Sequence, residues 1–151
     1  MNGFLGTQGN FAADLNLVAQ IGMGLALILG ALLARAGHYT AHGVCQATVM
    51  ALNLSTIALV MWPSFHAQVL PGLPRHIGKL YYATATVHGV LGFAAELFGI
   101  YIAMVAGTDI LPQAWRIRRW KLWMRIELAL WWLVLLTGSG IYKIWYTASH
   151  Q

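Results

Sequence analysis

The chain has 151 residues, of which 59% are hydrophobic and 9% are charged, and its formal net charge is +5. Soluble domains carry roughly 25% charged residues, so this composition excludes a protein that covers its surface with charge in water. The mean hydropathy of +0.64 indicates a protein that is integral to a membrane.

Four apolar stretches are long enough to cross a bilayer, which takes about 20 residues as a helix. In chain order they cover approximately residues 14–34, 39–65, 77–106 and 120–146. We therefore predict an all-α protein: an integral membrane four-helix bundle with antiparallel up-down topology, which forms a single transmembrane domain over residues 1–151.

Local signals mark the ends of these helices. Residues 1–13 contain no Lys or Arg, whereas a cleavable signal peptide begins with basic residues, so we expect the first helix to be retained. Ala36-Gly37 is typical of a glycine that closes a helix. Pro63 lies near the end of the second helix, where it either bends or terminates it, because proline lacks the amide donor and clashes with a continuing helix.

The basic residues predict an orientation. With four spans, both termini and the connection between the second and third helices share one side, which carries Arg75, Lys79 and Lys143. The other side carries six cations: Arg35, Arg116, Arg118, Arg119, Lys121 and Arg125. The excess marks the cytoplasmic side, so we expect both termini outside, with the protein integral to a bacterial inner (cytoplasmic) membrane. Trp115 and Trp120 within this cluster indicate a membrane boundary rather than a nucleic-acid partner.

Ionisable residues inside the spans are costly and therefore informative. By helical rise, Glu96, Arg125 and Glu127 fall in roughly one layer of the bundle. An Arg125–Glu96 or Arg125–Glu127 ion pair would relieve two charges at once, and we favour such a structural pair over a proton or ion site. Polar residues that we expect to point into the bundle are Gln20, Gln46 and Asn53.

Histidines are the candidate ligands. Neutral imidazole is the commonest protein metal ligand and the usual axial ligand of haem iron. Candidate cofactor ligands are His42, His66 and His88, and a metal alone could use His66, His76 and His88. Straight helices would leave His66 and His88 roughly 15–18 Å apart in depth, so a bend at Pro63 would be needed to bring them together.

From Ala41 onward the pattern resembles the YozB/CtaM type of small four-helix membrane proteins, which is tied to cytochrome c oxidase assembly. Members show a His at the start of one helix, a His closing it and a His inside the next, and here His42, His66 and His88 stand in these places. The stretch from Arg119 to Tyr142 is similar to the family's last helix, including Trp131 and the Thr137-Gly138 step. Where the family opens that helix with a His-Arg pair, this chain has Trp120 and Lys121.

The resemblance implies a membrane-embedded accessory protein of the respiratory chain that handles haem or copper, for example in haem-copper oxidase assembly. One alternative is an electron-transfer subunit that binds haem b between facing helices. Another is a cofactor-free structural subunit of a larger membrane complex, since membrane polar residues often only hold helices together. We expect lipid and other membrane subunits, or an oxidase, as partners. No sequence pattern supports an independent enzyme.

Overall fold

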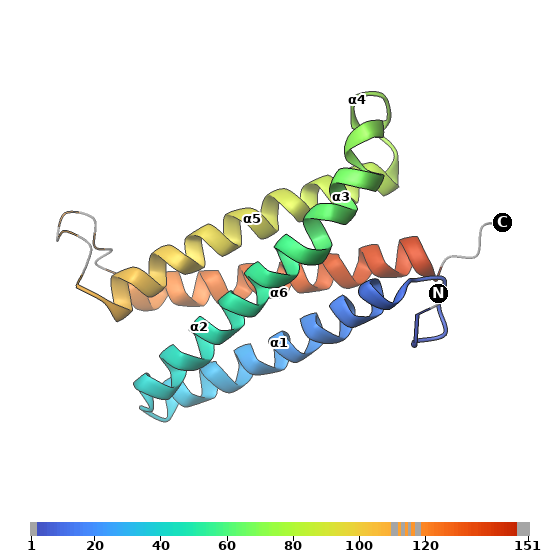
Figure 1. Ribbon diagram of the computed structural model, residues 1–151. Coiled ribbons are helices and arrows are strands. Elements are labelled where there is room, and N and C mark those ends of the chain that lie inside the picture. The colour runs from blue at the N-terminus through green and yellow to red at the C-terminus, as the bar shows by residue number, and fades with distance from the viewer. Residues whose placement is uncertain (1–2, 110–111, 113, 115, 117–118, 148–151) are drawn as a thin grey trace.

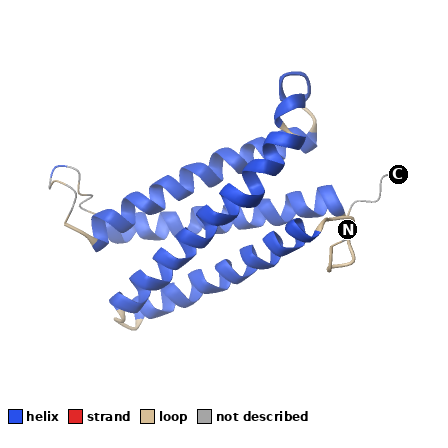
Figure 2. Ribbon diagram, viewed as in Figure 1, coloured by secondary structure: helices blue, strands red, loops and turns tan. Residues whose placement is uncertain are grey.

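The structure is a computed structural model that describes residues 3–109, 112, 114, 116 and 119–147. Trp115, Arg118 and His150 lie outside this part of the chain. Within it, four helical segments are long and apolar enough to cross a membrane: Phe11–Arg35, Tyr39–His76, Leu80–Gly107 and Trp120–Tyr146. The predicted all-helical fold with four membrane-length helices is confirmed, and Figure 2 shows that helix makes up most of the described chain.

The first helix, α1 (Phe11–Arg35), is capped at both ends. It starts three residues earlier than predicted, because the Asn10 side chain accepts a hydrogen bond from the Ala13 amide at 2.8 Å. At the other end Gly37 adopts a φ of 84°, and the His38 amide donates to the Leu33 carbonyl at 2.9 Å. The predicted glycine-closed end is confirmed, since only glycine takes this φ without a steric cost.

The second segment is a composite. It comprises α2 (Tyr39–Thr56), the π-helical turn η1 (Ile57–Met61), α3 (Trp62–Gln68), the 3-10 turn η2 (Leu70–Gly72) and α4 (Leu73–His76). Pro63 lies in the first turn of α3, directly after the π-helical turn. The wider turn accommodates the proline ring, which would otherwise meet the carbonyl of the preceding turn. Pro63 therefore does not terminate the helix, which continues to Gln68.

The last two long helices are α5 (Leu80–Gly107) and α6 (Trp120–Tyr146). Figure 1 shows the end of α1 and the start of α2 at the same end of the bundle as the end of α5 and the start of α6, with the start of α1 and the end of α6 at the other. The most extensive packing is within the pairs α1–α2 and α5–α6, and the pairs are joined through α1–α6 and α2–α5.

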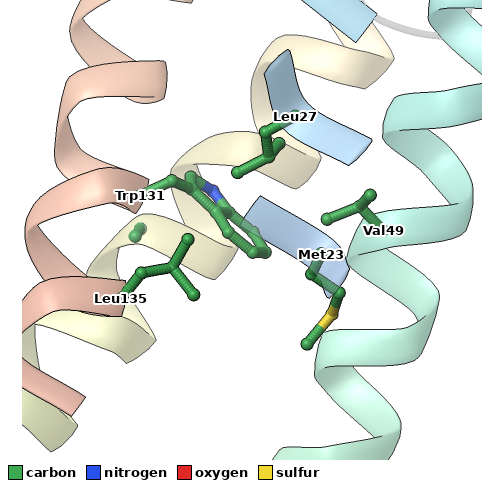
Figure 3. Packing of buried hydrophobic residues seen from close by; sticks show 6 residues of the cluster. Met23, Leu27, Val49, Trp131 and Leu135 are labelled. Atoms are coloured by element: carbon green, nitrogen blue, oxygen red, sulfur yellow. The ribbon is translucent and has the colours of Figure 1, made fainter. Parts of the chain in front are cut away.

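The buried core draws on all four long helices. Its buried residues are Met23, Leu27, Val49, Ala95, Trp131 and Leu135. In Figure 3 the Trp131 side chain extends from α6 toward Leu27 and Met23 of α1, with Val49 on the α2 side. The large apolar side chains on the outside of the helices remain exposed, which suits a bundle surrounded by lipid.

Candidate functional site

A chain of polar side chains crosses the middle of the bundle beside the Trp131 core. The Gln20 amide of α1 donates to Asn53 Oδ1 of α2 at 3.2 Å. Asn53 in turn donates from Nδ2 to Glu96 Oε2 of α5 at 2.9 Å. Asn53 and Glu96 are only 8% and 3% exposed. Three helices are thus linked through the carboxyl group of Glu96.

Glu127 brings α6 into the same region. Its Oε1 accepts a hydrogen bond from the Trp131 indole at 2.7 Å, and the side chain is 8% exposed. A Cβ atom built on Gly99 of α5 would lie 2.9 Å from this oxygen. Because Gly99 follows Glu96 by three residues on one helix face, the two carboxyl groups are neighbours and interact electrostatically.

The predicted ion pair of Arg125 is absent from the structure. Arg125 is exposed on α6, and the salt bridge found among the described residues joins Arg116 to Asp109 at 2.6 Å. Arg125 precedes Glu127 by two positions, which is about 200° around an α-helix. The two side chains therefore leave opposite faces of α6, although they lie at nearly the same depth. Among the described residues, no cation forms a salt bridge with Glu96 or Glu127.

His88 lies half-buried where α5 packs on α6. Its Nδ1 is 3.2 Å from the Thr137 hydroxyl, which is also 3.0 Å from the carbonyls of Leu133 and Val134. The hydroxyl has one proton and gives it to a carbonyl, so it accepts from the His88 Nδ1–H. The ring also has a hydrogen bond with the Val134 backbone; we assign it to the same Nδ1–H, which leaves the lone pair on Nε2.

The seat of the His88 ring depends on a glycine. A Cβ atom built on Gly138 would lie 2.9 Å from His88 Cε1, which is closer than side chains tolerate. Thr137 and Gly138 are therefore the two residues of α6 that position the imidazole. The resemblance noted above had singled out His88 and the Thr137-Gly138 step separately, 49 residues apart in the chain.

His42 lies in the α1–α2 hairpin, near the opposite end. Its Nδ1 donates to the Gly30 carbonyl of α1 at 2.8 Å. Gln46, one turn further along α2, is half-buried, and its amide would be 2.6 Å from a Cβ atom on Gly30. α1 and α2 therefore approach closely at Gly30, which accepts from His42 and, having no side chain, leaves room for Gln46.

The other two candidate histidines occupy the end that holds α3 and α4. His66 is exposed, and its ring centre is 6.2 Å from that of Trp62. The His76 ring stacks on Tyr82 at 5.4 Å, and its Nδ1 is buried with no hydrogen-bond partner among the described residues.

The Asn53–Glu96 hydrogen bond sets the register of α2 against α5. His66 follows Asn53 by 13 residues and His88 precedes Glu96 by eight, toward the same end. At ~1.5 Å per residue their depths differ by about 8 Å rather than ~15–18 Å. Even so, no hydrogen bond or ring contact joins His66 to His88 among the described residues. The two histidines stay in separate surroundings.

Asp14 is a buried polar residue that the sequence analysis did not single out. It is 0% exposed and accepts from the Leu5 amide at 2.7 Å, from the Tyr142 hydroxyl and from Thr7 at 3.5 Å. The Gln8 amide donates to the Tyr146 carbonyl at 3.1 Å. The segment before α1 is thereby fastened to the end of α6. An acidic residue in the first turn of an otherwise apolar helix was the available signal.

Within the described part of the chain, no three His, Cys, Asp or Glu side chains converge as metal ligands usually do. Comparisons with protein-family models, curated proteins and solved structures gave no match to the chain. Two places in the bundle remain as candidate sites: the surroundings of His88 and the Glu96–Glu127 pair.

Proposed function

We propose that this chain is a membrane-embedded accessory protein of the respiratory chain that handles haem or copper, with His88 as its principal ligand. The observation that carries the proposal is the seating of His88 against Thr137 and Gly138. His88 and the Thr137-Gly138 step are distant in sequence and belong to the resemblance separately, yet they are in contact here. Thr137 and Gly138 are shaped to hold the His88 ring.

The chemistry of His88 fits a metal ligand. Histidines that bind metal commonly donate their second ring N–H to an oxygen, which fixes the tautomer and the ring orientation. Thr137 provides that oxygen at Nδ1, so Nε2 is the nitrogen that would bind. Imidazole suits both copper and haem iron, and either metal would supply one-electron redox chemistry.

The donor set favours a transient role. His88 offers one nitrogen, and the described residues place no further group of ligands around it. A permanent site would need its remaining ligands from another chain or from the cargo itself. That arrangement suits a protein that passes haem or copper to a partner, such as a membrane subunit or an oxidase.

The haem b alternative requires a second histidine at the depth of His88. His42 precedes Asn53 by 11 residues, toward the end opposite to His88. At ~1.5 Å per residue the two histidines are about 28 Å apart along the bundle. His42 is therefore unsuitable as the second axial ligand, and the haem b reading is the weaker of the two. The cofactor-free structural subunit remains the alternative that the experiment below must exclude.

The proposed placement is a bacterial inner membrane, with both termini on the extracytoplasmic side. Five of the nine Lys and Arg residues of the sequence are described at or near the end where α1 meets α2 and α5 meets α6 (Figure 1): Arg35, Arg116, Arg119, Lys121 and Arg125. Because cytoplasmic ends collect basic residues, we assign that end to the cytoplasm. His88 then lies in the outer half of the bundle, where periplasmic copper or haem would arrive.

The test is an optical spectrum of the detergent-purified protein, oxidised and reduced with dithionite, together with metal analysis of the same sample. We expect bound copper or haem in the wild type, a loss of at least tenfold in His88→Ala, and no change in His38→Ala, which alters an exposed histidine. Thr137→Val should weaken binding without removing the ligand. Copper or haem content that is zero in the wild type, or equal in His88→Ala, would favour the cofactor-free subunit instead.

A further inference from the structure

The Glu96–Glu127 pair is the other polar feature of the membrane core, and it lies apart from His88. At ~1.5 Å per residue, Glu96 is about 12 Å from His88 along α5. Each carboxyl group has one oxygen that accepts a hydrogen bond, from Asn53 or from Trp131. The second oxygen of each, Glu96 Oε1 and Glu127 Oε2, is buried without a hydrogen-bond partner among the described residues.

The residues around the pair carry no compensating charge. α1 contributes Gln20 to the network and α2 contributes Asn53. Met50 Sδ of α2 and the Trp131 indole nitrogen of α6 would each lie 3.6 Å from a Cβ atom built on Gly99. The nearest cation in sequence, Arg125, is exposed on the opposite face of α6. Two adjacent carboxylates without a cation are strongly disfavoured in such a low-dielectric place, because burial and like charge both oppose ionisation.

We infer that Glu96 and Glu127 form a proton-binding site in the membrane core, and that the two carboxyl groups together hold one exchangeable proton on their unpartnered oxygens. A proton supplies the missing donor to these oxygens and reduces the charge of the pair from −2 to −1. The remaining charge is supported by the Asn53 and Trp131 N–H groups. Paired carboxyl groups in which one is protonated are a known outcome of this arrangement.

The residues next to the pair allow it to hold a proton but not to pass the proton on through a continuous relay. Asn53 is held by Gln20, and neither an amide nor an indole takes up a proton near neutral pH. A proton on the pair therefore cannot pass along the hydrogen bonds toward α1. Loss of the proton would instead place a second charge in the core and strain the packing of α5 on α6.

Asp14 provides an internal contrast. It is also fully buried, but its oxygens accept hydrogen bonds from the Leu5 amide, Thr7 and Tyr142. A carboxylate surrounded by donors is stabilised in its charged form. The sequence contains four acidic residues in all, so a protonated carboxyl group in this protein can be assigned with few variants.

The experiment is infrared spectroscopy of the full chain in detergent or lipid at neutral pH, in water and in deuterium oxide. We expect a carboxylic-acid C=O band that shifts in deuterium oxide and is absent from the variant Glu96→Gln/Glu127→Gln. The band should remain in Asp14→Asn. Absence of the band from the wild type, or its loss in Asp14→Asn, would overturn the inference. Loss of the band on addition of sodium at constant pH would also overturn it, since a metal cation would then be the occupant.

A second measurement avoids the variants, in case the double substitution fails to fold. Dicyclohexylcarbodiimide is an apolar reagent that reacts with protonated carboxyl groups: the acid O–H adds across one C=N bond, and nothing leaves. Peptide mass spectrometry of the labelled wild type should find the adduct on Glu96 or Glu127, decreasing as the pH rises. Adducts confined to Asp14 or Asp109 would refute the proposed site.

Discussion

The glycine at position 99 offers a sharp test of how the carboxyl pair is packed. We predict that Gly99→Ala destabilises the bundle, although alanine is the better helix former. A Cβ atom at this position would be 2.9 Å from Glu127 Oε1 and 3.6 Å from the Trp131 indole nitrogen. The carboxyl group must move, and the hydrogen bond of 2.7 Å from Trp131 must lengthen or break.

The magnitude follows from two opposing contributions. Replacing glycine by alanine inside a helix stabilises it by roughly 0.8–1 kcal/mol. Leaving a buried donor or acceptor without its partner costs about 1–3 kcal/mol. Since both Glu127 and Trp131 lose a partner, we expect a cost of about 2–6 kcal/mol and a net destabilisation of about 1–5 kcal/mol. For a chain of this size that corresponds to a decrease in the unfolding midpoint of roughly 2–20 °C.

Gly92→Ala is the matched control, because Gly92 lies on the same helix α5, seven residues before Gly99. There the added Cβ atom would meet Val134 Cγ1 at 3.5 Å, an ordinary van der Waals contact. We expect this variant to be as stable as the wild type or more stable. The assay is thermal unfolding of the detergent-solubilised variants, followed by far-ultraviolet circular dichroism. If Gly99→Ala unfolds at or above the midpoint of Gly92→Ala, the described packing around Glu127 is incorrect.

Two further predictions concern the ends of α1. Asp14→Asn places an amide N–H against the Leu5 amide or the Tyr142 hydroxyl, so the segment before α1 should detach. We expect faster hydrogen–deuterium exchange at residues 3–9, and unchanged exchange would contradict the role of Asp14. Gly37→Ala forces alanine to a φ of 84° and should destabilise the protein by about 1 kcal/mol. Gly43→Ala, on α2, should stabilise it, because the added Cβ atom meets nothing within 4 Å. Unfolding midpoints of the two variants that shift in the same direction would refute this.

Hydropathy was sufficient to predict the four helices. In a bilayer the backbone must satisfy its own hydrogen bonds, so a long apolar stretch has few choices other than a helix. The helices of the structure begin and end within a few residues of the predicted bounds. The π-helical turn before Pro63 could not be predicted. It forms only if the packing of the residues before and after the proline allows the helix to continue past it.

The partners of the polar residues were harder to predict, and the reason differs from case to case. Depth alone suggested that Arg125 meets Glu96 or Glu127, but depth does not say which face of the helix a side chain leaves. The spacing of two between Arg125 and Glu127 already contained the answer, because such residues point in opposite directions. The role of Asp14 could not be predicted from helical spacing, since its partners come from an irregular segment and from the far end of the chain.

The two proposed sites share one construction, which explains why both lie between α5 and another element rather than within the α1–α2 hairpin. In each, one atom of the functional side chain is fixed by a neighbour: Thr137 holds His88, and Trp131 holds Glu127. A glycine on the opposing helix, Gly138 or Gly99, supplies the space. The remaining atom, a ring nitrogen or a carboxyl oxygen, keeps its lone pair. In the membrane core such an atom has no water to bind, so it is available to a metal in the first proposed site and to a proton in the second.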